Sequence, residues 1–351
     1  MGKLAVYKYF SLMILVITIL VTIFTFFGLF GGNFNPVHET AIAMIVYVLP
    51  FLVAGNIIVL AYWLIRRRWH WAAIPFITLL CSLPYIGTVY QLGLFNPDTS
   101  HSGFKIASYN VAMFGREISG FKAEDILSEM RRQNVDILCI QEYMEMSGDK
   151  NNTQSYKTYF PYMAKGKNDM VVFSRFPIRS SETIDFGVTN NSAMWADIDI
   201  NGKMVRVYNA HLETTGFNRT LRKYAKMEMQ GANVEENAFI RAIYGNYTNG
   251  MVKRAVQADL MARKIKESKY PPIVCGDFND VPYSFTYNTM KGDLVDGFKE
   301  CGKGLMHTFR GNKKVRIDYI FHDESMTGEK YYKLDLSYSD HCPVFMKIST
   351  L

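Results

Sequence analysis

Polar side chains suited to phosphoryl chemistry occur in short clusters, each directly beside an apolar run. Such positions are strand ends, where α/β enzymes place their functional groups. Hydrolysis of a phosphate ester requires charge neutralisation at the phosphoryl oxygens, an activated water and a proton for the leaving oxygen. The clusters supply carboxylates, amides and histidines for these tasks, and they predict an enzyme. They are Ser108-Tyr109-Asn110, Gln141-Glu142, Asn209-Ala210-His211, Gly276-Asp277-Phe278-Asn279, Arg316-Ile317-Asp318-Tyr319 and Ser339-Asp340-His341.

Asp277 and Asn279 are two residues apart, directly after an apolar run. On an extended segment, side chains at this spacing face the same way. The pair therefore suits a clamp on one phosphate group or one water. Gly, Asp and Asn are also turn formers, so the motif alone could be a simple turn. The longer string of residues 274–282 makes that alternative weaker.

Two histidines stand at expected strand ends, His211 after Asn209 and His341 after Asp340. A histidine with a buried carboxylate partner is held in one tautomer, and its cationic form is stabilised. Such an imidazole suits a general base or a contact to the transition-state phosphate. An isolated histidine of this kind is more often structural, and Arg316 and Asp318 alone could be an ordinary hairpin ion pair.

The ordered set of clusters closely resembles the endonuclease/exonuclease/phosphatase superfamily of metal-dependent phosphoesterases, from about Phe104 to the C-terminus. The resemblance implies a four-layer α/β sandwich, in which two packed mixed β-sheets are flanked by helices. It also implies Mg²⁺ as cofactor, with Mn²⁺ as an alternative, and both are hard ions that prefer oxygen ligands.

Residue roles follow from the same resemblance. It implies that Asp318 is the carboxylate partner of His341, and it leaves the identity of the general base open. The implied metal ligands are Asn110, Glu142 and Asp340. The implied substrate contacts are Asn209, His211 and Asn279. The implied catalytic residues are His211, Asp277, Asn279, Asp318 and His341.

From Phe104 onward, short β-like runs alternate with helical patterns, which predicts an α/β layered domain. Residues 122–134 have the pattern of an amphipathic helix. Asn201-Gly202 separates two strand-like runs and predicts a hairpin turn. The expected strands are residues 106–109, 135–140, 170–174, 195–200, 205–209 and 272–275.

The strand rhythm breaks between Glu213 and Lys269, where eleven Lys or Arg stand against six Asp or Glu. The second half of this stretch predicts a helix that packs on the sheet through Val252, Ala255, Val256 and Leu260. Residues 215–249 resemble an insertion, directly after His211. Segments at such positions usually carry specificity rather than chemistry.

The first hundred residues are membrane-like, and we expect an anchor over residues 1–98 followed by a catalytic domain over residues 99–351. Three apolar segments are long enough to span about 30 Å of hydrocarbon. They are residues 9–30, 41–65 and 71–94, and the third is weaker because it contains two prolines and Gln91.

Basic residues predict the orientation of this anchor. Lys3 and Lys8 precede the first segment, and Arg66-Arg67-Arg68 follows the second, so the positive-inside rule puts both groups in the cytoplasm. A third span then delivers the catalytic domain to the periplasmic or extracellular side. If residues 71–94 are only interfacial or re-entrant, the catalytic domain is cytoplasmic instead.

Charge does not identify the substrate. Past Asp98 there are 34 basic and 30 acidic residues, a net charge of +4, which is too mild to indicate nucleic-acid binding. The leading hypothesis is a membrane-anchored phosphoesterase acting on a phosphodiester or phosphomonoester, with a lipid headgroup, inositol phosphate, nucleotide or nucleic acid as substrate class. A nuclease is the runner-up, and a catalytically inactive membrane receptor or scaffold is the alternative from another class. No protein partner can be inferred.

Overall fold

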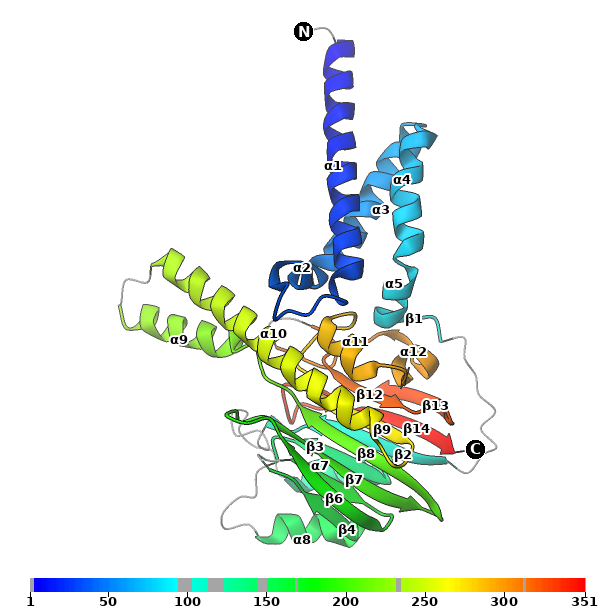
Figure 1. The fold of residues 1–351 in the computed structure, drawn as a ribbon. Helices are drawn as coiled ribbons and strands as arrows, with labels where there is room; N and C mark the ends of the chain where they lie inside the picture. Colours follow the sequence, from blue (N-terminus) through cyan, green and yellow to red (C-terminus); the bar gives the residue numbers. More distant parts are fainter. Residues whose placement is uncertain are drawn as a thin grey trace. The chain divides into compact units, whose positions relative to one another are not determined.

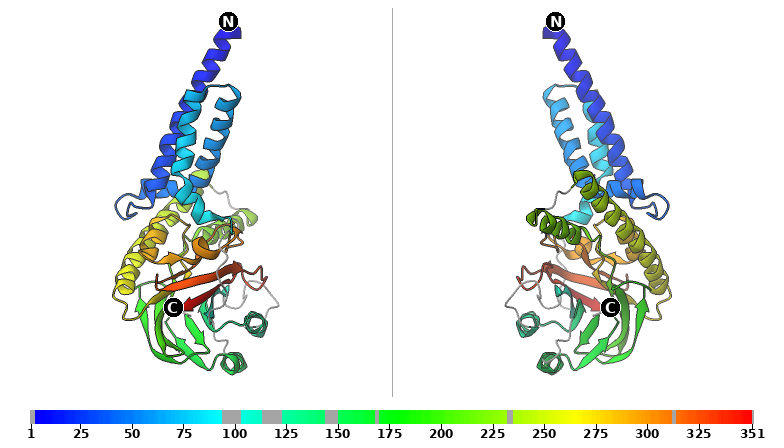
Figure 2. Two further views of the ribbon diagram at one scale, coloured as in Figure 1. Left: turned by 90° about the vertical axis from the view of Figure 1, so that its right-hand side faces the viewer. Right: turned by 90° about the vertical axis from the view of Figure 1, so that its left-hand side faces the viewer.

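The computed structural model describes residues 3–93, 103–112, 123–143, 150–167, 170–231, 235–311 and 314–350. The chain forms two compact units. One comprises Met1–Val89 with Pro282–Asn288, and the other comprises Tyr90–Val281 with Thr289–Leu351. The expected domain boundary after Asp98 lies outside the described residues. The helices and strands of each unit are drawn in Figures 1 and 2.

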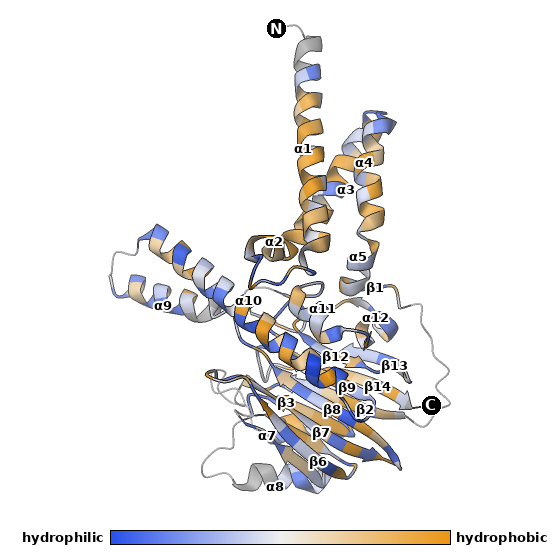
Figure 3. Ribbon diagram, in the orientation of Figure 1, coloured by the Kyte–Doolittle hydropathy of each residue, from blue (hydrophilic) through white to orange (hydrophobic). Residues whose placement is uncertain are grey.

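The N-terminal unit contains the apolar helices expected from the sequence, and hydrophobic residues predominate along α1, Lys3–Gly31 (Figure 3). Two segments are long and apolar enough to cross a membrane, Tyr7–Gly31 and Thr40–Ile65, close to the first two predicted spans. The helices of this unit are α1 (Lys3–Gly31), α2 (Thr40–Met44), η1 (Ile45–Val48), α3 (Leu49–Ile65), α4 (Trp69–Cys81) and α5 (Leu83–Val89).

The third predicted span is not one straight helix ending at Leu94. It consists of α4 and α5, which meet at an angle of 50°. Pro84 accounts for the break, because proline has no backbone N–H to donate to the preceding turn and is favoured in the first turn of a helix, where it lies in α5. Helix α5 ends at Val89, and Tyr90–Gln91 is a short strand, β1, that pairs with Gly304–Leu305, β11.

Polar side chains connect the apolar helices to one another. Asn56 of α3 donates a hydrogen bond to the hydroxyl of Thr25 in α1 at 2.8 Å, and the indole of Trp63 donates to Thr18 at 3.0 Å. Hydrogen bonds of this kind hold transmembrane helices together, because lipid offers polar groups no alternative partner.

Sheet I is mixed, since β2 and β3 run parallel and its other neighbours run antiparallel. Each of these two parallel strands ends at one of the polar clusters identified in the sequence, β2 at Asn110 and β3 at Gln141. The spatial order of its described strands is β13 (Met326–Lys333), β14 (Val344–Thr350), β2 (Gly103–Asn110), β3 (Ile137–Gln141), β5 (Val171–Ser174) and β4 (Tyr162–Lys165).

Sheet II is also mixed, with β8 and β9 as its parallel pair. The expected hairpin at Asn201-Gly202 joins β7 to β8, and both turn residues have positive φ, 54° and 91°, as this tight turn requires. The spatial order of its described strands is β10 (Val295–Asp296), β12 (Asp318–His322), β9 (Pro272–Asp277), β8 (Lys203–His211), β7 (Ser192–Ile200) and β6 (Ile178–Asp185).

The two sheets pack face to face, which confirms the predicted four-layer sandwich. Alternate side chains of both sheets form one buried cluster, including Ile106 and Val172 from sheet I and Val207 and Ile273 from sheet II. Helices cover the outer faces, with α7 (Ala123–Arg132) and α8 (Lys150–Tyr159) on sheet I and α10 (Glu236–Lys266) along sheet II (Figures 1 and 2). The expected helix at residues 122–134 is α7, although Lys122 lies outside the described residues.

The insertion after His211 is helical. Residues 217–229 form α9 (Phe217–Met229), and α10 begins at Glu236, well before the helix expected from the sequence. Tyr224 and Phe239 pack with ring centroids 4.9 Å apart, which joins the two helices. Two short helices, α11 (Phe285–Lys291) and α12 (Gly297–Cys301), follow β9 and β10.

Candidate active site where strand ends of the two sheets meet

Three of the expected catalytic residues form one row across sheet II. His211 ends β8 and is in register with Asp277 at the end of parallel β9, and Asp277 is in register with Asp318 at the start of antiparallel β12. Gly276 permits this arrangement. Its φ is 136°, and a Cβ there would lie 1.9 Å from the carbonyl oxygen of Ala210 on β8. A side chain at position 276 would therefore separate the strands that carry His211 and Asp277.

Sheet I contributes a second row at the same place. Asn110 ends β2 in register with Gln141 of β3, and Glu142 follows directly. The amide nitrogen of Asn110 donates to Glu142 Oε1 at 3.1 Å and to Asp277 Oδ2 at 3.0 Å. Glu142 has a φ of 55°, a strained conformation for a residue with a Cβ, and such strain is concentrated at functional sites.

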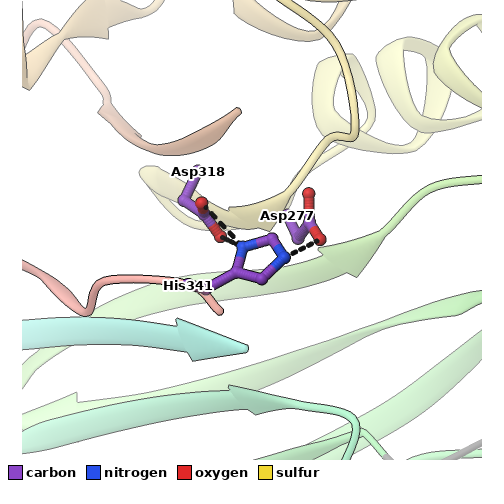
Figure 4. A group of neighbouring side chains, drawn as sticks. All are labelled: Asp277, Asp318 and His341. Carbon is purple, nitrogen blue, oxygen red and sulfur yellow. Dashed lines mark hydrogen bonds and ion pairs between the residues drawn. The ribbon is translucent and has the colours of Figure 1, made fainter. Parts of the chain in front are cut away.

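His341 lies between two carboxylates (Figure 4). Its Nδ1 is 3.1 Å and 3.2 Å from the carboxylate oxygens of Asp318, and its Nε2 is 3.6 Å from Asp277 Oδ2. Arg316 does not compete for Asp318, because its guanidinium pairs with Asp296 at 2.8 Å. The structure thus brings His341 and Asp318 together as the resemblance implies.

Burial opposes protonation of His341, but attraction to Asp318 and Asp277 outweighs it and raises the pKa of His341 to about 10. Burial also raises the pKa of Asp277 to about 6, against the attraction of His341. At neutral pH the imidazole is therefore a cation held between carboxylates. A buried cation aimed at this site is suited to stabilising an anionic phosphoryl group.

His211 lies on the other side of Asp277. Its Nε2 is 3.8 Å from Asp277 Oδ2 and 3.8 Å from Glu142 Oε1. Burial lowers the pKa of His211, against the attraction of Asp277. The two histidines thus have opposite charge preferences, one cationic and one neutral, which suits different proton-transfer roles.

Asn279 is held in a second strained turn, with φ of 51°. Its backbone N–H donates to Asp277 Oδ1 at 2.8 Å, and its side-chain amide donates to the carbonyl oxygen of Leu212 at 2.9 Å. These bonds bring the segment after β9 against the segment after β8. Asp277 and Asn279 therefore lie in one loop cluster with His211, although Asn279 is in a left-handed turn and not in the extended segment expected from the spacing.

Asn209 is fully buried below this cluster. Its amide nitrogen donates to the carbonyl oxygens of Ile140 at 3.0 Å and Val171 at 3.1 Å, and its side-chain oxygen accepts from Gln141 at 2.7 Å. In this arrangement Asn209, expected to contact the substrate, joins sheet II to sheet I.

Sequence reasoning did not assign a role to two further residues. Ser339 donates to the carbonyl oxygen of Asn110 at 2.8 Å and accepts from the backbone N–H of His341 at 3.1 Å, so it connects the loop of His341 to the end of β2. Gln141 forms the buried link to Asn209. The signal for both was their place inside the polar clusters, directly beside residues that were assigned.

Asp340, Tyr109 and Phe309 flank the site differently. Asp340 is half-buried and contributes to the raised pKa of His341. Phe309 packs edge-on against the His341 ring, with centroids 5.1 Å apart. Tyr109 has no exposed surface and belongs to the core between sheet I and α7.

The donor set fits a hard divalent cation. Ligand atoms of Asp277, Asp318 and His341 lie within 4.8 Å of one another, close enough to surround one ion. The carboxylate oxygens of Glu142, which accept from the Asn110 amide, are harder donors than the imidazole nitrogen of His341. Mg²⁺ and Mn²⁺ prefer such oxygens. Asn110 presents its amide nitrogen to both carboxylates, and its oxygen accepts from the N–H of Ala112, so ligation by Asn110 requires the amide to turn over.

Comparison with known proteins agrees with this geometry. The family model described as "Endonuclease/Exonuclease/phosphatase family" matches residues 107–341, and a second model, a domain of unknown function, matches residues 11–89. A search of curated proteins finds no match.

Solved structures share the fold at low sequence identity. A humanized D. rerio TDP2 is 18% identical with a TM-score of 0.53, covering 71% of this chain and 99% of that one. An endonuclease/exonuclease/phosphatase family protein from Bacteroides thetaiotaomicron is 18% identical with a TM-score of 0.52, covering 72% and 99%. D. rerio TDP2 complexed with single strand DNA product is 17% identical with a TM-score of 0.51, covering 71% and 100%.

Proposed function

The chain belongs to the endonuclease/exonuclease/phosphatase family, whose members hydrolyse phosphoesters, and from this premise we propose that it is a membrane-anchored, Mg²⁺-dependent phosphoesterase acting outside the cytoplasm. One observation carries the proposal. Asn110 bonds Glu142 and Asp277 across the two sheets, and His341 lies between Asp277 and Asp318. A bound Mg²⁺ would supply positive charge to the phosphoryl oxygens at the Glu142 side of this cluster.

The chain's own residues supply the proton transfers, the orientation of the phosphoryl group and the stabilisation of its charge. Asp277, with its raised pKa, accepts the proton of the attacking water, and Asn279 orients the phosphoryl group beside it. Cationic His341, held by Asp318, stabilises the charge that develops on the phosphoryl oxygens. His211, beside Asp277, contacts the phosphoryl group and donates a proton to the leaving oxygen. We further propose that Asp340 adds negative charge near the metal.

A lipid-derived phosphoester is the favoured substrate class, because an enzyme anchored in a bilayer meets lipid headgroups at high local concentration. A nuclease remains the second candidate. Exposed Arg222, Lys223 and Lys226 lie on α9, and a basic surface of this kind suits a polyanionic backbone. The intact set of carboxylates and histidines argues against an inactive receptor or scaffold.

A substrate panel tests the assignment. Full-length protein in detergent micelles with Mg²⁺ should hydrolyse phospholipid or sphingomyelin headgroups with a higher kcat/KM than inositol phosphates, nucleotides or DNA. His341→Ala protein, purified in the same way, controls for contaminating hydrolases. Faster cleavage of DNA would establish the nuclease alternative, and wild-type protein inert toward the whole panel would refute a phosphoesterase.

The anchor should place the catalytic domain outside the cytoplasm. The Arg66-Arg67-Arg68 cluster forms the turn between α3 and α4, and a basic turn is retained on the cytoplasmic side. Crossing by the bent pair α4 and α5 would then export everything after Val89. An alkaline phosphatase fused after Leu351, active only after export, should be active in cells. A fluorescent fusion that matures only in the cytoplasm is the matched reporter, and its fluorescence would contradict the three-span topology.

A further inference from the structure

Helix α10 carries a buried polar stripe. Gly250, Arg254 and Gln257 are spaced i, i+4, i+7, so they lie along one side of the helix. Arg254 has no exposed surface and Gln257 is 6% exposed. The neighbouring buried positions of α10 are apolar or small and pack toward the sheet, namely Met251, Ala255, Ala258, Met261 and Ile265. The polar stripe is therefore an exception within an otherwise ordinary packing face.

The stripe holds the chain segment that follows His211. Arg254 Nη1 donates to the carbonyl oxygen of Glu213 at 3.0 Å, and Gln257 Oε1 accepts from the N–H of Glu213 at 2.8 Å. Gly250 lets this segment approach the helix, since a Cβ there would lie 2.8 Å from the carbonyl oxygen of Thr214. Both peptide groups of Glu213 are thus fixed by α10, two residues after His211.

The same guanidinium also holds the loop of Asn279. Arg254 Nε is 3.2 Å from Asp280 Oδ2, and Asp280 directly follows Asn279. The carbonyl oxygen of Asp280 accepts from the hydroxyl of Tyr319, the neighbour of Asp318 in β12. One buried side chain therefore bridges the segments that follow β8 and β9, which carry His211 and Asn279.

Stability does not explain why this position carries an arginine. Burying two charges costs desolvation energy that their attraction does not reliably recover, and replacement by packed apolar side chains is often neutral or stabilising. A methionine or leucine on this stripe would continue the apolar face of α10. The geometry that the guanidinium imposes on two catalytic loops is what an apolar residue cannot supply.

We propose that Arg254 is a positioning residue for the reaction, which fixes Glu213 and Asp280 and thereby holds His211 and Asn279 at their places around Asp277. The inference rests on the proposed phosphoesterase function and deepens it. Arg254 itself does not touch the substrate. Small displacements of reacting groups lower turnover strongly, so loss of this bridge reduces kcat while the Glu142 side of the site keeps its affinity for Mg²⁺.

Variants of Arg254 and Asp280 distinguish a positioning role of Arg254 from simple neutralisation of the Asp280 charge. Arg254→Met removes the buried cation that faces the Asp280 carboxylate and should lower both the melting temperature and kcat. Arg254→Met/Asp280→Leu removes both charges, so the melting temperature should recover while kcat for bis(p-nitrophenyl) phosphate stays about 10-fold or more below wild type. Arg254→Lys should have a kcat between those of Arg254→Met and wild type. It restores the positive charge, but an ammonium cannot reproduce the guanidinium fork that reaches both Glu213 and Asp280. The KM and the Mg²⁺ concentration for half-maximal rate should stay near their wild-type values.

Arg206→Met is the matched control. Arg206 bonds Asp197 through Nε at 2.6 Å and Nη2 at 2.9 Å, midway along β7 and β8 and five residues before His211. It should cost stability without lowering the kcat of the folded enzyme. Recovery of kcat in Arg254→Met/Asp280→Leu, or an equal kcat loss in Arg206→Met, would overturn the positioning role.

A readout independent of activity separates this inference from the proposed function. In full-length protein carrying ¹³C-labelled histidine, the imidazole signal of His211, assigned by its loss in His211→Gln, should shift in Arg254→Met/Asp280→Leu and stay in place in Arg206→Met. An unshifted His211 signal in the double variant would refute positioning even if wild-type protein is an active phosphoesterase. Inactive wild-type protein with the expected shift would instead refute only the proposed reaction.

Discussion

Replacing His341 with alanine should reduce turnover by about 10²-fold or more, because general acid–base and charge-stabilising groups contribute on that scale. Asp318→Asn should have a similar effect, since Asp318 holds the His341 ring through Nδ1 and stabilises its cation. Both effects should appear in kcat with little change in KM. Initial rates on bis(p-nitrophenyl) phosphate, with circular dichroism to verify folding, measure them.

The two substitutions should also be strongly non-additive, because residues that act as one unit lose their joint contribution once. The double variant should be little worse than His341→Ala alone. Asp318→Asn should additionally move the alkaline limb of the pH–rate profile to lower pH, since the carboxylate is one cause of the raised pKa of His341. Multiplicative losses with both proteins folded would show that Asp318 serves another partner.

Removal of the divalent ion should abolish hydrolysis, and Mg²⁺ or Mn²⁺ should restore it. Glu142→Gln should lower the rate by about 10²-fold and raise the Mg²⁺ concentration needed, because a neutral amide holds a hard dication less well than a carboxylate. Rates in metal-buffered solution over a range of free Mg²⁺ measure both effects. Glu182→Gln, an exposed substitution in β6, is the matched control and should behave as wild type. Full activity in excess chelator would exclude the assigned metal site.

The chemistry-bearing residues could be predicted because they stand where apolar runs stop. Each such boundary is local in sequence, so Asp277, Asn279 and His341 were identifiable without any knowledge of packing. Their mutual distances were not, because the row of His211, Asp277 and Asp318 depends on the register of three strands. Local patterns do not determine register between strands that are distant in sequence. For Asp318, the pairing with His341 was implied by the family resemblance and not by local pattern.

The expected apolar face of α10 is right for Ala255, which is buried, and wrong for Val256. Val256 was expected to pack on the sheet, but it is 57% exposed, whereas Arg254 is buried. Periodicity assigns apolar residues to the buried side of a helix and basic residues to the exposed side. Its partners, Glu213 and Asp280, lie 41 and 26 residues away in sequence. A buried ion pair of this kind leaves no local signal.

Asn209 and the third apolar segment illustrate the same limit. Asn209 was identified as a polar residue at a strand end, but the hydrogen bonds by which its amide joins the two sheets could not be predicted from the sequence. The apolar run of residues 71–94 is continuous enough to suggest one helix, but a new helix begins at Leu83, with Pro84 in its first turn, and Tyr90–Gln91 pairs as a strand. Composition predicts that a segment is apolar, whereas backbone hydrogen bonding decides where the helix ends.

The rate of phosphodiester hydrolysis as a function of free Mg²⁺ tests the central claim most directly. Full-length wild-type protein in detergent should hydrolyse bis(p-nitrophenyl) phosphate at a rate that rises from zero in chelator and saturates with Mg²⁺. His341→Ala protein, folded and equally pure, should remain near the background rate at every Mg²⁺ concentration. Equal, Mg²⁺-independent rates for the two proteins would contradict the assignment of this cluster as a metal-assisted phosphoesterase site.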